Sequence, residues 1–385
     1  MNLKLIGSSL IISGTALGAG MLAIPMVLAQ FGLLWGTALM LFIFIGTTYA
    51  ALLLLEASIN VGGGLGMNTI ARKSLGKGGQ LVTNGLLYAL LICLLMAYIL
   101  GAGDLLNKLL RNIGFDLSLV QSQVAFTLIA GVIVASGTAV IDKINRALFA
   151  IMLFMLLLTL VFLVPGISLD NMTQVSNSNP SELIQTSAII FTSFGFMVVI
   201  PSLVSYNHEA TPKQLRNMVI IGSSIPLVCY LIWLYAVVGN LTPEQITHFS
   251  NVSELISVFS AEHSFINLVL SSFTGLALLT SFLGVAMALF TQNEDTFKQN
   301  KVVTYVISFI LPLAGAIFAA DQFLSVLSYA GIILVFLAVF IPLAMVIKLR
   351  QTGGGQAKSY LAEGGVAMLI FSFIFGNFLL ISQVI

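Results

Sequence analysis

The chain has 385 residues, of which 58% are apolar and 8% are charged, and its formal net charge at pH 7 is +1. A soluble domain is about one quarter charged, whereas this chain gathers its apolar residues in blocks of about twenty, which suit a bilayer. Composition and charge therefore exclude a soluble enzyme, a secreted disulfide scaffold, a nucleic-acid binder and a disordered chain. The sequence indicates a polytopic membrane protein with a single domain.

Eleven apolar segments are long enough to cross the hydrocarbon core, which takes about 20 residues of helix. We therefore predict an all-α integral membrane protein with eleven transmembrane helices. In chain order the predicted spans are Leu5–Phe31, Leu33–Ile59, Leu81–Leu100, Val124–Val140, Ala147–Gly166, Thr186–Tyr206, Val219–Val238, Phe265–Phe290, Val302–Ala319, Phe323–Ile347 and Gly365–Ile385.

The basic residues predict how these spans are oriented. With the N-terminus in the cytoplasm, thirteen of the fifteen Lys and Arg residues fall in inside segments, and only Lys108 and Arg111 fall outside. Cytoplasmic loops of membrane proteins carry the excess of Lys and Arg. We therefore expect a cytoplasmic N-terminus and, after eleven crossings, a C-terminus on the opposite side.

Two spans contain interruptions that a helix in a bundle does not need. Residues 14–20 in the first read Gly-Thr-Ala-Leu-Gly-Ala-Gly, followed by Pro25, and residues 192–196 in the sixth read Thr-Ser-Phe-Gly-Phe, followed by Pro201. The first span runs outward and the sixth inward, so the breaks occupy corresponding places in two halves of opposite orientation. Paired breaks of this kind are typical of a transporter binding site.

A broken helix leaves peptide groups that lipid cannot satisfy, and it is tolerated where it lines a cavity or meets a ligand. N-terminal ends of half-helices favour a carboxylate, whereas their C-terminal ends and unwound carbonyls favour an ammonium group or a small cation. The alternative is close helix packing through small residues, for which Gly14 and Gly18 have the required spacing. The matching break in the sixth span favours the binding site.

The spans also limit the charge of the cargo. No Lys, Arg, Asp, Glu or His lies near the middle of a predicted span, and the one embedded acid, Glu56, lies near the cytoplasmic end of the second. Embedded ionisable groups mark proton relays and partners of charged cargo. We therefore expect an amino acid with an uncharged side chain. The residues that offer it a partly aromatic lining are Tyr88, Ile92, Tyr98, Phe194, Phe196 and Met197.

A sodium site is a further hypothesis. Ala277, Thr280 and Ser281 share one face of the eighth span, and with unwound carbonyls at Gly14 and Leu17 they would form an all-oxygen cage, which hard cations prefer. The alternative is that both hydroxyls bond the backbone of their own helix.

Three segments resemble those of a known family. Residues 14–25, Gly-Thr-Ala-Leu-Gly-Ala-Gly-Met-Leu-Ala-Ile-Pro, resemble the first-span signature of the aromatic and hydroxy amino acid permeases. Residues 192–206 are similar to the sixth-span signature of that family, and residues 280–285, Thr-Ser-Phe-Leu-Gly-Val, to its eighth-span signature. The resemblance extends over the whole chain.

This resemblance implies the LeuT-like fold of the amino acid–polyamine–organocation superfamily. That fold is an inverted repeat of five plus five helices, with helices one and six discontinuous, and here one extra C-terminal helix. We place the first repeat at residues 1–166, the inverted second repeat at residues 186–347 and the extra helix at residues 365–385.

The resemblance also implies roles for the broken segments. Backbone amides of Gly18, Ala19 and Gly20 would receive the substrate carboxylate, and carbonyls around Thr15, Thr192 and Phe194 would receive its ammonium group. The other predicted substrate contacts are Ala16, Tyr88, Ile92, Gly195 and Phe196.

One departure from the family concerns ion coupling. The family commonly has His after the Ser-Phe-Gly-Phe stretch, and this chain has Met197 there. No proton acceptor is therefore assigned, and sodium coupling stays open beside the proton coupling that the resemblance implies.

The resemblance implies a permease and not an enzyme. We expect a secondary transporter that imports aromatic amino acids, tyrosine first, across the bacterial inner membrane by proton symport through alternating access. A sodium-coupled carrier, a carrier of serine or other neutral amino acids, and a channel-like or lipid-handling protein are the alternatives. We expect no cofactor other than the coupling ion, which is a proton or sodium, and assign no certain metal site. The expected partners are the amino acid and the bilayer, with no nucleic acid, while the oligomeric state is left open.

Overall fold

The computed structural model describes residues 3–18, 20–62, 66–135, 138–242, 244–246, 249–260, 264–297, 301–320, 322–352 and 360–385. Every regular element in these ranges is helical. In chain order the elements are α1 (Leu3–Ala16), α2 (Gly20–Leu28), η1 (Ala29–Phe31), α3 (Gly32–Asn60), α4 (Met67–Asn112), α5 (Leu119–Ala135), α6 (Thr138–Leu163), η2 (Val164–Gly166), α7 (Leu169–Thr173), α8 (Pro180–Gln185), α9 (Ser187–Ser193), η3 (Phe196–Val199), α10 (Ile200–Tyr206), α11 (Pro212–Val238), α12 (Val252–Ser260), α13 (Ser264–Phe297), α14 (Lys301–Ala319), α15 (Phe323–Val335), η4 (Phe336–Phe340), α16 (Ile341–Thr352) and α17 (Gly365–Ile381).

Among the described residues, seven helical stretches are long and apolar enough to cross a membrane, and four further apolar helices are shorter. Every predicted span overlaps one of these stretches, which confirms the all-helical class. The count of eleven crossings stays a prediction. The seven long stretches are Gly20–Asn60, Met67–Asn112, Lys143–Gly166, Pro180–Tyr206, Pro212–Val238, Phe265–Asn293 and Phe323–Thr352, and the four shorter ones are Leu3–Ala16, Leu119–Val134, Val303–Ala319 and Gly365–Ile381.

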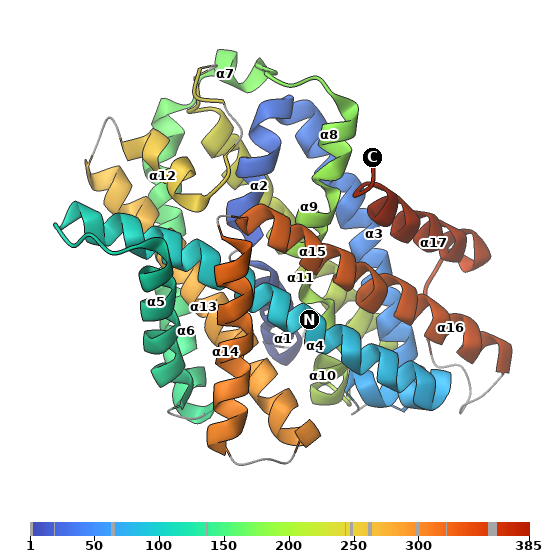
Figure 1. The fold of residues 1–385 in the computed structure, drawn as a ribbon. Coiled ribbons are helices and arrows are strands. Elements are labelled where there is room, and N and C mark those ends of the chain that lie inside the picture. Colours follow the sequence, from blue (N-terminus) through green and yellow to red (C-terminus); the bar gives the residue numbers. More distant parts are fainter. Residues whose placement is uncertain are drawn as a thin grey trace.

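The broken segments lie at the centre of the bundle. α5, α6, α13 and α14 gather at one side of Figure 1 and α3, α16 and α17 at the other, with α1, α2 and α9 between them. α1 packs along α11, while α9 and α10 pack along α3. The first segment of each predicted half therefore pairs with the second long helix of the other half, although the residue bounds of the two repeats stay a prediction.

Two further irregularities occur in helices other than those with the predicted breaks. Gly76 has a φ of 82° inside α4, a backbone conformation that favours glycine. In the tenth predicted span, the π-helix η4 separates α15 from α16. Pro342 is the second residue after it and has no N–H to donate to a carbonyl one turn earlier, which accounts for an irregular turn at this place.

The last helix, α17, packs against α3 through aromatic rings. Phe42 of α3 makes edge contacts with Phe371, Phe375 and Phe378, at centroid distances of 6.4, 5.7 and 5.1 Å. A Cβ atom at Gly46, one turn further along α3, would lie 2.4 Å from the Phe375 ring. The absence of a side chain at Gly46 is thus what lets the two helices approach.

Candidate functional site

The first break separates α1 from α2. α1 ends at Ala16 and α2 begins at Gly20, while the Gly18 carbonyl accepts a hydrogen bond of 3.1 Å from the Met21 N–H. A Cβ atom at Gly18 would lie only 2.3 Å from Oγ of Ser281 on α13. The bare Gly18 backbone therefore faces the eighth predicted span directly. Ala19, the middle residue of the predicted amide set, lies outside the described residues.

The second break separates α9 from α10. α9 ends at Ser193, and the chain passes through Phe194 and Gly195 into the short 3-10 helix η3 before α10 begins at Ile200. The Gly195 N–H donates to the Thr192 carbonyl at 3.0 Å, which is a tighter turn than an α-helix makes. Both discontinuous helices predicted from the sequence are thereby confirmed.

The two breaks touch each other. A Cβ atom at Gly20 would lie 2.8 Å from the Cα atom of Ser193, so the α2 and α9 backbones meet without a side chain between them. The Ser193 hydroxyl is placed to donate to the Gly20 carbonyl at 2.8 Å and to the Ile189 carbonyl at 3.1 Å. Residues far apart in sequence thus form one site.

Tyr230 of α11 joins the C-terminal ends of both half-helices. Its hydroxyl lies 2.6 Å from the carbonyl oxygen of Ala16 and 2.6 Å from that of Ser193, and its side chain is fully buried. Ala16 and Ser193 are the last residues of α1 and α9. A phenol has one proton, so it donates to one of these carbonyls at a time. We call Tyr230 Oη and the two carbonyl oxygens the oxygen cluster.

Two serine bonds fasten α1 along α11 below the cluster. The hydroxyl of Ser9 lies 3.1 Å from the carbonyl oxygens of both Met218 and Leu5, and that of Ser13 lies 2.8 Å from the Gly222 carbonyl oxygen and 2.9 Å from that of Ser9, so each can donate across to α11 or back to its own helix. Pro226 lies inside α11, one turn after Gly222. Because proline has no N–H, the Gly222 carbonyl lacks its helical donor and is free to accept the serine bond.

The proposed sodium ligands lie partly at the first break. Ser281 faces Gly18 and is hydrogen-bonded to Tyr98 of α4. The Thr280 hydroxyl donates to the Leu276 carbonyl at 2.8 Å, which is the bond within its own helix that the alternative describes. Ala277 is fully buried in the core. Leu17 is buried as well, and a Cβ atom at Gly14 would lie 3.2 Å from the Phe149 ring of α6. The sodium site stays a prediction.

Aromatic residues fill the second break rather than leave it open. The Phe194 ring packs edge-on against Tyr230 at a centroid distance of 5.1 Å and in a tilted arrangement against Phe44 of α3 at 6.0 Å. Phe196 and Met197 are fully buried. The Phe194 side chain thus lies between α3 and α11, while the Thr192 hydroxyl donates to the Ala188 carbonyl at 2.7 Å.

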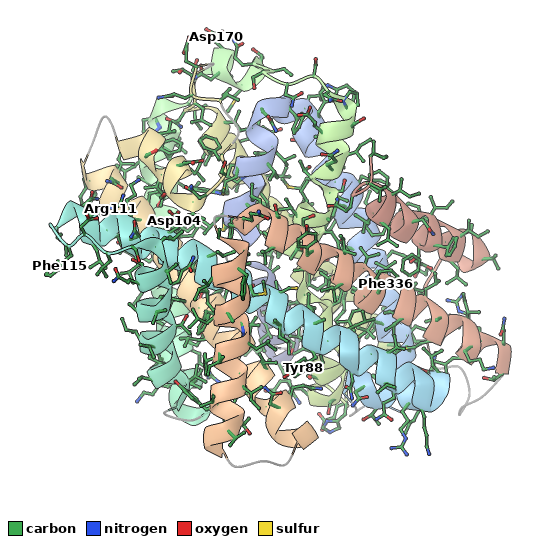
Figure 2. The ribbon with its side chains drawn as sticks, viewed as in Figure 1. Tyr88, Asp104, Arg111, Phe115, Asp170 and Phe336 are labelled. Atoms are coloured by element: carbon green, nitrogen blue, oxygen red, sulfur yellow. The ribbon has the colours of Figure 1, made fainter. Side chains whose placement is uncertain are left out.

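The predicted lining residues differ in how close their side chains come to the breaks. The side chain of Thr15 is exposed, and its hydroxyl donates to the Ile11 carbonyl of its own helix. Tyr88 precedes Tyr98 by ten residues on α4, or about 15 Å of helix, and Figure 2 shows it on a stretch of α4 well removed from Asp104. Ile92 is half-buried between Tyr88 and Tyr98. Tyr98 is therefore the α4 tyrosine that reaches the Gly18 region.

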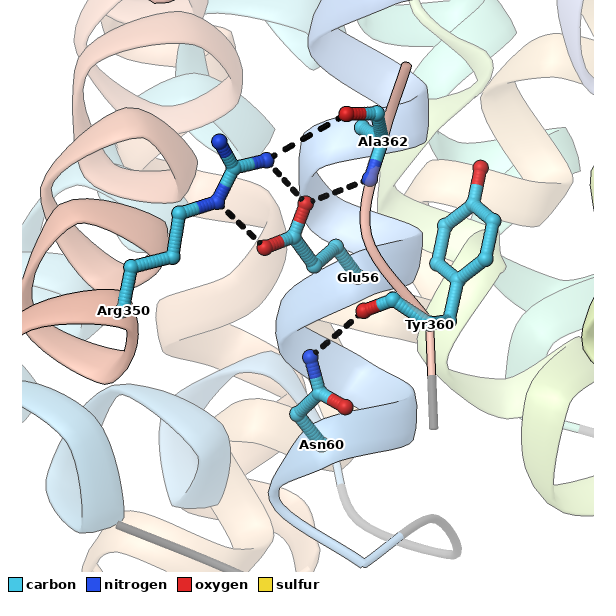
Figure 3. A network of polar contacts seen from close by, with 5 residues as sticks. All are labelled: Glu56, Asn60, Arg350, Tyr360 and Ala362. Atoms are coloured by element: carbon cyan, nitrogen blue, oxygen red, sulfur yellow. Dashed lines mark hydrogen bonds and ion pairs between the residues drawn. The ribbon is translucent and has the colours of Figure 1, made fainter. Parts of the chain in front are cut away.

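The embedded acid Glu56 belongs to another part of the molecule. Its carboxylate accepts hydrogen bonds from Arg350 Nε at 2.8 Å and Arg350 Nη2 at 2.6 Å, and from the Ala362 N–H at 2.7 Å (Figure 3). Close by, the Asn60 amide donates to the Tyr360 carbonyl at 2.8 Å. These contacts tie the ends of α3 and α16 to the segment before α17. Burial raises the pKa of Tyr360 to about 12, so its phenol stays neutral.

Comparison with known proteins identifies the family. The model of the tryptophan/tyrosine permease family matches residues 1–383. The chain belongs to this family. It is 61% identical to glutamine transporter 2 of Aliivibrio fischeri over the full length of both chains. It is 34% identical to tyrosine-specific transport system 1 of Haemophilus influenzae, over 97% of this chain and 94% of the relative.

A solved structure shows the same fold as this permease. The nucleobase-cation-symport-1 family transporter Mhp1, in a closed conformation with bromovinylhydantoin, superposes with a TM-score of 0.65 at 14% identity, covering 98% of this chain and 89% of Mhp1. The permease therefore has the LeuT-like transporter fold, as predicted. Its family and relatives are amino acid transporters and not enzymes, which confirms that part of the prediction.

The oxygen cluster is not predictable from the sequence. Tyr230 lies in the middle of an apolar span, where an aromatic residue is most often a packing residue, and Ser193 stands out only as part of the Thr-Ser-Phe-Gly-Phe stretch. The one local signal is a mid-span tyrosine one helical turn beyond an interior proline. No local pattern places this tyrosine against both breaks.

Proposed function

We propose that this permease imports a neutral amino acid across the bacterial inner membrane by ion-coupled alternating access, with glutamine as the first candidate cargo. The observation that carries the proposal is the meeting of the two breaks through Gly20, Ser193 and Tyr230. Peptide groups from two half-helices of opposite predicted orientation converge there, as a zwitterionic cargo requires.

The chemistry of the site supports a cargo without side-chain charge. The side chains that the described contacts bring to the breaks are hydroxyls and apolar groups, namely those of Ser193, Tyr230, Ser281 and Phe194. An ion in a membrane interior needs a partner of opposite charge. A zwitterion finds complementary partners in helix ends, because N–H groups suit its carboxylate and carbonyls suit its ammonium group.

Two candidate cargoes come from the relatives. The 61% identical relative is named for glutamine, whereas the 34% identical one is named for tyrosine. Both amino acids have neutral side chains, and identity favours glutamine. Tyrosine, the cargo expected from the sequence, is the second candidate, supported by the aromatic surroundings of Phe194.

Orientation and coupling are also proposed. The thirteen-to-two distribution of Lys and Arg supports a cytoplasmic N-terminus and a periplasmic C-terminus. Proton symport follows from the family resemblance. Sodium symport is the alternative, supported by the position of Ser281 opposite Gly18.

Uptake into proteoliposomes tests this function. Purified protein is given labelled L-glutamine or L-tyrosine under a proton gradient alone, a sodium gradient alone, or neither. We expect saturable glutamine uptake that accumulates against its gradient only under the proton gradient, and competition by unlabelled glutamine. Flux without saturation would contradict a carrier, and saturable uptake of tyrosine but not glutamine would make tyrosine the cargo.

A further inference from the structure

The oxygen cluster has two carbonyl acceptors but only one hydroxyl proton to donate to them. Tyr230 Oη lies 2.6 Å from both the Ala16 and the Ser193 carbonyl oxygens, yet it has one proton to donate. At any moment one of these carbonyls faces the phenol oxygen without a hydrogen between them. Because Tyr230 is fully buried, an acceptor left in this position costs free energy unless a positive group approaches it.

The position of the carbonyls strengthens this effect. Both belong to the last residue of a helix, so they carry the negative ends of the α1 and α9 dipoles. In a bundle interior such charges are weakly screened. The cluster therefore attracts a group that carries several N–H donors and a positive charge.

We infer that Tyr230 is a positioning residue for the ammonium end of the cargo, an inference that rests on the proposed function. Its hydroxyl holds the Ala16 and Ser193 carbonyls on either side of one oxygen atom and fixes the distance between the two breaks. An ammonium group has three donors and satisfies the carbonyl that the phenol leaves without a proton. Recognition of the amino group, and not of the carboxylate, depends on Tyr230.

The surrounding contacts show why Tyr230 is held in place. The Phe194 ring supports it edge-on at 5.1 Å. The Ser9 and Ser13 bonds hold α1 against the same helix, α11, so that the Ala16 carbonyl is presented to the phenol. The carboxylate end of the cargo would meet the other ends of the breaks, where α2 begins at Gly20.

The test is Tyr230→Phe, which removes only the hydroxyl. The matched control is Tyr235→Phe on the same helix, because the Tyr235 hydroxyl lies 3.3 Å from that of Thr37 and away from both breaks. A hydrogen bond to a charged group is worth about 1.5–3 kcal/mol. Without the phenol the Ala16 and Ser193 carbonyls are no longer held at one point, and the ammonium loses one such bond to a displaced carbonyl. We therefore expect Tyr230→Phe to raise the KM for L-glutamine about tenfold to a hundredfold, with kcat changed much less, and Tyr235→Phe to leave the KM unchanged.

Analogues separate positioning of the ammonium from general damage. Glutaramate lacks the amino group of glutamine, and 4-aminobutanamide lacks its carboxylate. Inhibition by glutaramate should be the same in wild type and Tyr230→Phe, while inhibition by 4-aminobutanamide should weaken by the same factor as glutamine. If wild type transports tyrosine instead, 3-(4-hydroxyphenyl)propanoate and tyramine take their places.

The outcomes distinguish this role from the proposed function. An unchanged KM in Tyr230→Phe, or equally weakened inhibition by both analogues, would overturn the role of Tyr230. Glutamine uptake by the wild type would still support the proposed carrier function. Absence of amino acid binding by the wild type would overturn the proposed function itself. Should Tyr230→Phe not elute as folded protein, Tyr230→His, whose shorter ring cannot place a donor where the phenol oxygen lies, takes its place with the same expected loss, and binding is measured by ligand-induced thermal stabilisation.

Discussion

The oxygen cluster and the Glu56 network both hold backbone ends together with one buried side chain, but they differ in how completely their hydrogen bonds are made. The Glu56 carboxylate accepts a bidentate pair of hydrogen bonds from Arg350 and a third hydrogen bond from the Ala362 N–H. Tyr230 offers one proton to two carbonyls. The carboxylate accepts all three of these bonds at once, whereas the phenol can donate to only one of its two carbonyls at a time.

This difference separates a structural tie from a binding site. A buried ion pair with complete hydrogen bonds has nothing left for a ligand, and its main effect appears when one partner is removed. An incomplete cluster of buried acceptors gains most when a ligand arrives. We therefore expect the charged network to serve stability and the uncharged one to serve the recognition proposed above.

The largest effect is expected from Arg350→Ala, which leaves Glu56 buried without its partner. We expect the free energy of unfolding to fall by about 3–5 kcal/mol, seen as a lower melting temperature in detergent. The KM for glutamine of the folded fraction should stay that of the wild type. Lys348→Ala, at an exposed position on the same helix, is the control. If Arg350→Ala melts at the same temperature as the wild type, the Glu56 network does not stabilise the fold.

A smaller loss of stability, with loss of uptake, is expected from Gly20→Ala. The added Cβ would lie 2.8 Å from the Ser193 Cα atom, so the α2 and α9 backbones must separate. Overpacking of this kind costs about 1–3 kcal/mol, and the shift disturbs the oxygen cluster. The control is Gly7→Ala, since a Cβ at Gly7 meets nothing within 4 Å. Normal uptake by Gly20→Ala would show that the contact between the breaks is not needed.

The smallest effect is expected from Gly18→Ala, because the atom in its way is a serine oxygen that can rotate. The new Cβ would lie 2.3 Å from Ser281 Oγ but 3.6 Å from Ser281 Cβ. Adding Ser281→Ala should therefore recover most of the stability lost, with a coupling of about 1 kcal/mol in a double-mutant cycle of melting experiments. Strictly additive losses would mean that Gly18 and Ser281 do not meet.

The parts of this fold that follow from local sequence were predictable. The breaks are predicted by Gly18, Gly20, Gly195 and the prolines after them, and the fold class is predicted by the length of the apolar segments. The choice between Tyr88 and Tyr98 was not predictable, because a span that is apolar on all sides gives no sign of which face or depth meets the site. The orientation of the Phe194 ring was not predictable either, because it depends on packing against a helix far away in sequence.

Tyr230 shows the same limit most clearly. Its hydroxyl contacts residues 214 and 37 positions away, and no periodicity records such a meeting. Pro226 was predictable in part. The proline itself predicts a carbonyl one turn earlier that lacks its helical donor, but the sequence does not predict that the Ser13 hydroxyl contacts this carbonyl.

The Ser9 and Ser13 bonds have a mechanical consequence. These serines are four residues apart on α1, and the carbonyls that they reach, at Met218 and Gly222, are four residues apart on α11. The two helices therefore run in the same direction, and the spacing of the serine hydroxyls matches the spacing of the carbonyls. Sliding α1 by one residue, about 1.5 Å, breaks both bonds, whereas a jump of about 6 Å brings the hydroxyls to the next carbonyls. A motion that carries α1 and α11 together keeps both bonds, whereas a slide of one helix along the other returns each hydroxyl to the carbonyl four residues earlier in α1, at Leu5 and Ser9.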